Sequence, residues 1–92
     1  MTHTISASYE GATVKLNFSE QGQAELFING VTRESANAGT QHITLKLGSP
    51  VQTGYEHHEF IEAEVQYDAQ RIHARLHTGG QTLAEQEIDR VS

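Results

Sequence analysis

The stretch YEHHEFIEAEVQYDAQRIHARLH, residues 55–77, decides the fold of this chain. Apolar and polar side chains alternate along 61–67 and again along 72–76. This two-residue period places alternate side chains on opposite faces of a strand. The pattern predicts two long strands joined by a turn at 68–70, with one face of the hairpin in the core. Residues 55–59 are polar on both faces, so this end is expected to project past the core.

The outer face of the predicted hairpin carries charges of opposite sign. Its first strand contributes Glu62 and Glu64, and its second strand contributes His73, Arg75 and His77. Opposite charges that face each other across antiparallel strands contribute about 0.2–1 kcal/mol each. A slip of one residue would bury these charges and expose the apolar set, so the charges help to specify the register.

The rest of the chain repeats the same kind of pattern. Turn signals punctuate it at the spacing typical of small β-sandwiches and barrels, and Asn29-Gly30 is the strongest of them because a type I′ turn needs positive φ at both positions. The sequence predicts one all-β domain over residues 1–92, with about eight antiparallel strands in meander order, as a small β-sandwich or a flattened barrel. The expected strands are 2–9, 12–18, 24–28, 31–35, 41–47, 55–67, 71–77 and 82–88.

Two segments are less regular. GSPVQTG, residues 48–54, contains the single proline and is expected to be a loop close to the functional surface. Residues 82–91 fit either a final strand or a helix, because Thr82 and Glu85 match a capping box. We favour the strand, since ARLHTGGQT (74–82) repeats the layout of the hairpin sequence AELFINGVT (24–32).

The composition excludes several classes of partner and site. Twelve acidic residues against six basic ones give a formal charge of −6, which disfavours nucleic acid or an anionic membrane as the main partner. The chain has no cysteine, so disulfides and thiolate metal sites are excluded. The N-terminal residues do not resemble a signal peptide, and no apolar run approaches the ~20 residues of a membrane span. We expect a cytoplasmic protein.

Histidines and carboxylates offer a candidate metal site on the outer face of the hairpin, which fits better than the segment 56–59, where the adjacent His57 and His58 would point to opposite faces. His58 and Glu62 would share the outer face of the hairpin with His77 and with His73, and three nitrogen or oxygen ligands can hold Zn²⁺. Arg75 on the same face would oppose a cation. We therefore interpret the cluster as a solvated ladder of ion pairs, with no metal and no cofactor.

Two phenylalanines fall on otherwise polar faces. Phe27 and Phe60 are expected to point outward, and we place both on one sheet as a possible partner site, because aromatic side chains are enriched in interface cores. No nucleophile elbow, phosphate loop or zinc-protease motif is present, so the chain is not expected to be an enzyme.

The hypothesis is a non-catalytic protein-interaction module, such as an accessory, inhibitor or assembly protein, that binds a protein partner or itself as a homodimer. Its candidate binding residues are His58, Phe60, Glu62, Arg75, His77 and Phe27. The alternative is a small β-barrel carrier of an apolar ligand, and a His/Glu metal-dependent enzyme comes third.

Overall fold

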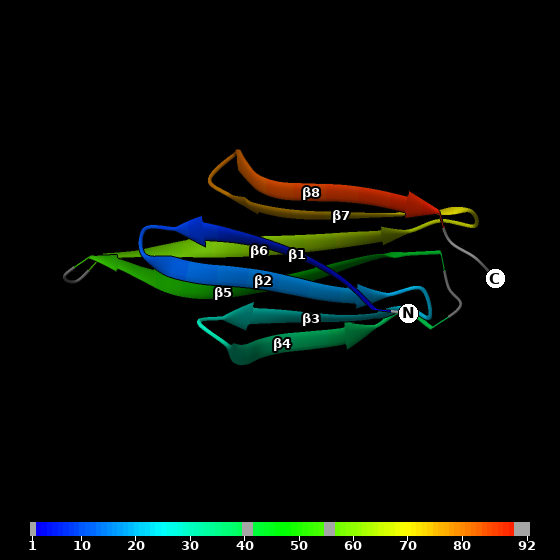
Figure 1. Ribbon diagram of the computed structural model, residues 1–92, viewed down its shortest axis with the longest axis horizontal. Helices are drawn as coiled ribbons and strands as arrows, with labels where there is room; N and C mark the ends of the chain where they lie inside the picture. Colours follow the sequence, from blue (N-terminus) through cyan, green and yellow to red (C-terminus); the bar gives the residue numbers. More distant parts are fainter. Residues whose placement is uncertain (1, 40–41, 55–56, 90–92) are drawn as a thin grey trace.

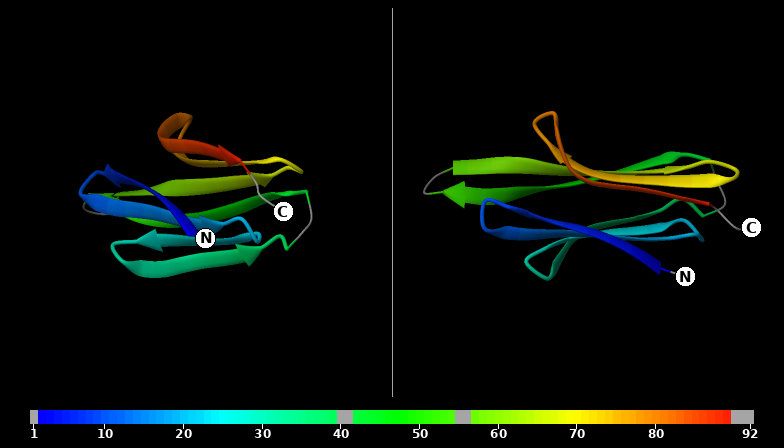
Figure 2. Two further views of the ribbon diagram at one scale, coloured as in Figure 1. Left: turned by 45° about the vertical axis from the view of Figure 1, so that its right-hand side comes forward. Right: turned by 45° about the horizontal axis from the view of Figure 1, so that its top comes forward.

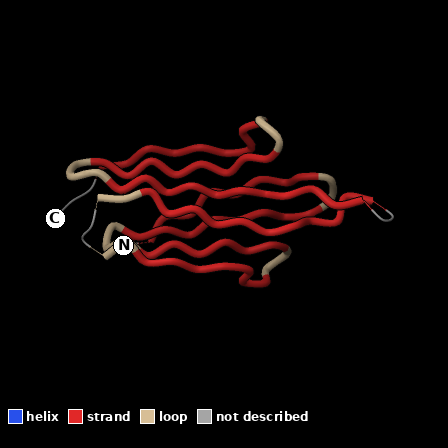
Figure 3. Tube along the Cα trace, turned by 180° about the vertical axis from the view of Figure 1, so that it is seen from behind, coloured by secondary structure: helices blue, strands red, loops and turns tan. Residues whose placement is uncertain are grey.

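The fold is all-β and consists of two four-stranded antiparallel sheets without a helix in the part of the chain that the structure describes (Figures 1 and 3). This computed structural model describes residues 2–39, 42–54 and 57–89, without the side chains of residues 52–54, 57 and 58. The strands are β1 (Thr2–Tyr9), β2 (Ala12–Ser19), β3 (Gln23–Ile28), β4 (Val31–Asn37), β5 (Thr44–Gly54), β6 (His57–Tyr67), β7 (Arg71–Thr78) and β8 (Gln81–Asp89).

Each sheet is a simple meander, and the two sheets stack face to face. The first sheet has the order β1-β2-β3-β4 and the second has the order β5-β6-β7-β8. In the right-hand view of Figure 2 they form two layers. β4 lies beside β5 and β1 lies beside β8 where the edges of the two sheets meet. The expected β-sandwich in meander order is therefore confirmed.

The core fills the space between the two sheets. It is built from the alternate apolar residues of the strands, as the two-residue period predicts. The largest of these side chains are almost fully buried, and each contributes about 1.5–3 kcal/mol relative to exposure. They are Tyr67, Phe18, Leu16, Leu26, Ile61, Ile72, Leu76, Val14 and Val65.

Two tyrosine hydroxyls link the sheets across this core. The Tyr67 hydroxyl on β6 lies 2.9 Å from the carbonyl oxygen of Ser19 and 3.2 Å from that of Gln23, so it donates to the backbone between β2 and β3. Tyr9 at the end of β1 donates to Glu59 on β6 at 2.8 Å. This bond, followed by burial, raises the pKa of Tyr9 above its ordinary value.

Tight turns set the register of several hairpins. Asn29 and Gly30 both have positive φ, at 51° and 81°, which confirms the predicted type I′ turn between β3 and β4. Gly79 and Gly80 play the same part between β7 and β8. The turn between β6 and β7 also lies where the sequence predicts it, at 68–70.

The sequence repeat corresponds to a structural repeat. In the β3–β4 hairpin Leu26 pairs with Glu34, Phe27 pairs with Thr32, and the register shifts between these two pairs. In the β7–β8 hairpin the pairs are Leu76 with Ala84 and His77 with Thr82, with the shift at the same place. Each residue of the second hairpin follows its counterpart in the first by the same number of positions along the chain. The bulge is thus repeated position for position, and residues 81–89 form a strand; the helical alternative is wrong.

The expectation of a loop at 48–54 is wrong. β5 continues through this segment and pairs with β6 up to Gly54. Ser49 faces the core and is buried. Because it is polar, the alternation of apolar and polar residues that marks the other strands is interrupted here. Pro50 is compatible with a strand at the edge of a sheet, where one N–H faces away from the ladder.

Smaller differences lie at the strand ends. Ile43 was expected to face the core, but it precedes β5 and is 39% exposed. β4 runs two residues past the predicted 31–35, and the predicted strand ends at 41 and at 55–56 lie outside the described residues. The far ends of β5 and β6 extend past the other strands, as the polar residues there predict (Figure 1). The described residues include no helix long and apolar enough to cross a membrane.

Candidate functional site

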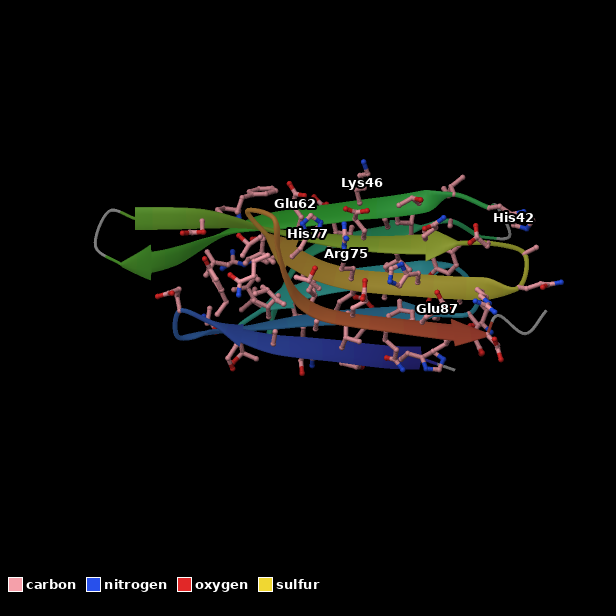
Figure 4. The ribbon with its side chains drawn as sticks, turned by 90° about the horizontal axis from the view of Figure 1, so that it is seen from above. His42, Lys46, Glu62, Arg75, His77 and Glu87 are labelled. Carbon is pink, nitrogen blue, oxygen red and sulfur yellow. The ribbon has the colours of Figure 1, made fainter. Side chains whose placement is uncertain are left out.

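The outer face of the second sheet carries a ladder of alternating charges. Register aligns Lys46 on β5 with Glu64 on β6, and Glu64 with Arg75 on β7. Arg75 is in turn aligned with Glu85 on β8. Each charge therefore faces its opposite across the strands, which is the arrangement that stabilises a sheet register. Figure 4 shows Arg75 beside Glu62 and His77, with Glu87 and His42 toward the other end of the molecule.

Three side chains converge next to Arg75. Glu62 and His77 are directly paired across β6 and β7, and the His77 Nε2 atom lies 3.4 Å from the Glu62 carboxylate. The same nitrogen lies 2.9 Å from Glu64 Oε1. All three potential ligand atoms lie within 4.8 Å of one another. We call these residues the Glu62–Glu64–His77 cluster.

Glu64 is the most strongly held member of the cluster. Burial alone would raise the pKa of its carboxyl group, but hydrogen bonds from His77 and from Arg75 outweigh burial and hold the pKa below its ordinary value. The Arg75 guanidinium donates to the same Oε1 atom at 3.3 Å. Glu64 is therefore a carboxylate that stays ionised while two neighbours fix its orientation.

An open groove lies alongside this cluster. Its volume is about 360 Å³, and Glu62 and Glu64 form part of its wall. The remaining lining residues come from β4, β5 and β6, and they are Glu34, Lys46, Leu47, Gly48, Phe60 and Ala63.

Phe60 is the exposed aromatic residue of the groove. It is 54% exposed, and its ring lies so close to Gly48 that a Cβ atom at that position would be 2.5 Å from the ring. Glu34 of the first sheet accepts a hydrogen bond from the Gly48 N–H at 3.1 Å. An aromatic ring over a strand glycine is a known stabilising device in sheets, so one face of Phe60 has a structural role. The rest of the ring remains available to a partner.

Phe27 does not belong to this surface. It lies on β3 of the first sheet, whereas Phe60 lies on β6 of the second, so the expectation that both share one sheet is wrong. The outward orientation is right: the Lys15 Nζ atom lies 5.0 Å from the centroid of the Phe27 ring, a cation–π contact. Through the repeat, Phe27 is the counterpart of His77.

The structure brings together only some of the residues that the sequence suggested as metal ligands. Glu62 and His77 come together, but His73 pairs with Glu85 at 2.9 Å, and the side chain of His58 lies outside the described residues. Sequence reasoning missed Glu64 as a third member. The alternation already placed it on the same face as Glu62, but only the register shows that it reaches His77 diagonally.

The other groove residues carried no usable signal in the sequence. Glu34 comes from a strand of the other sheet, so its approach to Gly48 depends on how the sheets stack.

Comparison of the chain with protein-family models, with curated proteins and with solved structures gave no match. Inferences about function therefore depend on the geometry of this surface.

Proposed function

We propose that this protein is a non-catalytic interaction module of the cytoplasm that binds a protein partner through the outer face of the second sheet. The observation that carries the proposal is the ring of Phe60, 54% exposed in a groove between fixed charges. Aromatic side chains that are exposed in the free protein and surrounded by polar groups are typical anchors of protein interfaces. Glu62, Arg75 and His77 are the charged and polar residues proposed to accompany this anchor on the same outer face; the side chain of His58, expected from sequence to join them, lies outside the described residues.

A second copy of the chain is the first partner to consider. In a two-fold dimer the same patch meets itself, so the patch must be complementary to itself. The groove offers both signs of charge: Lys46 is exposed on β5, and the Glu62 side chain is 53% exposed on β6. Lys46 of one copy could then face Glu62 of the other, with the two Phe60 rings at the centre of the interface.

The carrier alternative has less support than the interaction module. Large apolar side chains with under 2% exposure occupy the space between the two sheets, where a ligand of a closed barrel would have to lie. Native mass spectrometry of the purified protein tests this alternative, since a carrier is expected to retain its ligand.

The substitution Phe60→Ser tests the proposed interface. We expect it to abolish self-association, or capture of the partner protein, because it removes the apolar anchor and leaves the surrounding charges in place. The measurement is light scattering or sedimentation equilibrium over a concentration series. Val31→Ser is the matched control, since Val31 is also 54% exposed but lies on β4 of the first sheet.

A third variant separates binding from folding. Phe60→Leu keeps an apolar cover over Gly48, so its melting temperature should stay closer to wild type than that of Phe60→Ser. The interface proposal fails if Phe60→Ser associates like the wild type, or if Val31→Ser weakens association by the same amount.

A further inference from the structure

We propose that the Glu62–Glu64–His77 cluster is a binding site for a single Zn²⁺ ion. The cluster combines one imidazole nitrogen with two carboxylates, a ligand set that Zn²⁺ accepts in proteins. It lies on the two central strands of the second sheet, where β6 and β7 are each hydrogen-bonded on both sides. Glu62 and His77 belong both to this cluster and to the proposed interface, but Phe60 belongs to the interface alone, so the two proposals can be tested separately.

The distance between His77 and Glu62 matches that of a tetrahedral zinc site, and the distance between His77 and Glu64 is shorter because these two residues share a hydrogen bond. With metal–ligand bonds of about 2.0–2.1 Å, two ligands of a tetrahedral ion are about 3.3–3.4 Å apart. The His77 Nε2 atom lies 3.4 Å from Glu62 Oε2 and 2.9 Å from Glu64 Oε1. An ion between the three ligand atoms requires the Glu64 carboxylate to move away from the His77 nitrogen, so that their hydrogen bond is replaced by two bonds to the metal.

The groove supplies the open position that a three-ligand site needs. Glu62 and Glu64 line the groove, whereas the His77 side chain is only 15% exposed. An ion between these three ligands would be reached from the groove side. Its fourth ligand would be water, the arrangement found where a protein provides three ligands.

Arg75 affects such a site in two opposite ways. Its charge opposes a cation, but its guanidinium donates to Glu64 at 3.3 Å and so fixes one of the ligands. Hydrogen bonds of this kind to a ligating carboxylate typically change metal affinity by about 10–100-fold when they are removed.

The repeat provides an internal comparison. The register pairs Glu62 with His77 in the second sheet and Lys15 with Phe27 at the corresponding place in the first. Lys15 and Phe27 form a cation–π contact and offer no metal ligand. The proposal therefore predicts one bound Zn²⁺ per chain.

Isothermal titration of the full chain with Zn²⁺ tests the proposal, with Mg²⁺ as the competing hard cation. Absorption spectra with Co²⁺ in place of Zn²⁺ report whether the geometry is tetrahedral. We expect His77→Gln and Glu64→Gln each to weaken binding at least about tenfold. His73→Gln is the matched control, because His73 is also on the outer face of β7 and bonds a glutamate at 2.9 Å.

Other histidines need their own control. The double variant His57→Gln/His58→Gln removes the adjacent pair at the start of β6 and should bind Zn²⁺ like the wild type. The proposal is supported by one tetrahedral site that is lost in His77→Gln and kept in His73→Gln. It is overturned if the wild type does not bind, if His77→Gln binds as tightly as the wild type, or if the His57/His58 variant alone loses the site. Phe60→Ser should keep the site, so failure of this proposal and failure of the proposed interface are distinguishable.

Discussion

At the scale of single residues, Glu64 connects the stability of the second sheet to pH. Burial is the largest single influence and raises the pKa of its carboxyl group, but the hydrogen bonds and positive charges of His77 and Arg75 together outweigh burial and hold the folded-state pKa below the ordinary value of 4.5. A depressed carboxyl pKa stabilises the fold at all pH values above the unfolded pKa. That stabilisation is lost as the pH falls below about 4.5 and through the lower pKa of the folded state.

The substitution Glu64→Gln should remove this dependence. At about pH 7 we expect the variant to be less stable than the wild type by up to about 1 kcal/mol, as is usual for partly exposed ion pairs. The difference should shrink as the pH falls through the lowered pKa of the folded state, because the wild-type carboxylate is then protonated as well. Urea unfolding of both proteins across this pH range measures the difference in their free energies of unfolding.

Removal of a carboxylate also lowers the net negative charge, and this effect needs a control. Glu25→Gln removes the same charge from β3 of the first sheet, at the position that corresponds to Arg75 in the repeat. The difference in free energy of unfolding between Glu25→Gln and the wild type should depend less on pH than the corresponding difference for Glu64→Gln. Equal slopes in the two variants would mean that Glu64 has no special part in the acid response.

At the scale of elements, the turn between β2 and β3 is tightly constrained. Gly22 has a φ of 99°, and a Cβ atom there would lie 2.4 Å from the carbonyl oxygen of Gly39. The Gly22 carbonyl also accepts a hydrogen bond from Ala38 N–H at 2.7 Å. The turn and the chain after β4 therefore pack backbone against backbone, so neither can give way by rotating a side chain.

We expect Gly22→Ala to be among the most damaging small substitutions in the chain. A strained φ costs about 1–3 kcal/mol, and the clash with Gly39 adds to this. Gly30→Ala is the matched control, because Gly30 also has a positive φ but has no atom within 4 Å of the added Cβ. Thermal unfolding of both variants should show a clearly larger loss at Gly22; similar losses would show that packing against Gly39 contributes nothing.

Most elements could be predicted from the sequence, because alternation is a local signal. The central hairpin, its turn at 68–70 and the Asn29-Gly30 turn follow directly from it. The β5 segment could not be predicted in this way, since Ser49 and Pro50 interrupt the pattern and only the pairing with β6 identifies them as strand. The groove could not be predicted either, because Glu34 reaches Gly48 from the other sheet.

The Glu62–Glu64–His77 cluster was partly predictable. Alternation places all three residues on one outer face, but it leaves open whether Glu62 faces Arg75 or His77. The observed register selects His77, and this brings Glu64 into diagonal contact with the same imidazole. Register is a property of two strands together, so single-strand patterns do not contain it.

At the scale of the whole molecule, neither sheet is expected to be stable alone. Each has one face made of core side chains, and a single sheet with an open apolar face needs a second layer to cover it. Separate halves cut between β4 and β5 should therefore lack cooperative unfolding. Mixed in equal amounts, they should recover the far-ultraviolet circular dichroism of the intact chain. A half that unfolds cooperatively alone would contradict this account of the core.

The repeated meander brings its first and last strands together. β4 and β5 lie side by side where the first half leads into the second, and β8 and β1 lie side by side where no peptide bond joins them. β8 ends and β1 begins at the same end of the molecule (Figure 1). Each strand therefore lies beside the next one in the series, and the last lies beside the first. The native chain is interrupted between β8 and β1, and the corresponding place in the repeat lies between β4 and β5. A circular permutant that is opened between β4 and β5, with β8 linked to β1, would keep every strand neighbour that the native chain has.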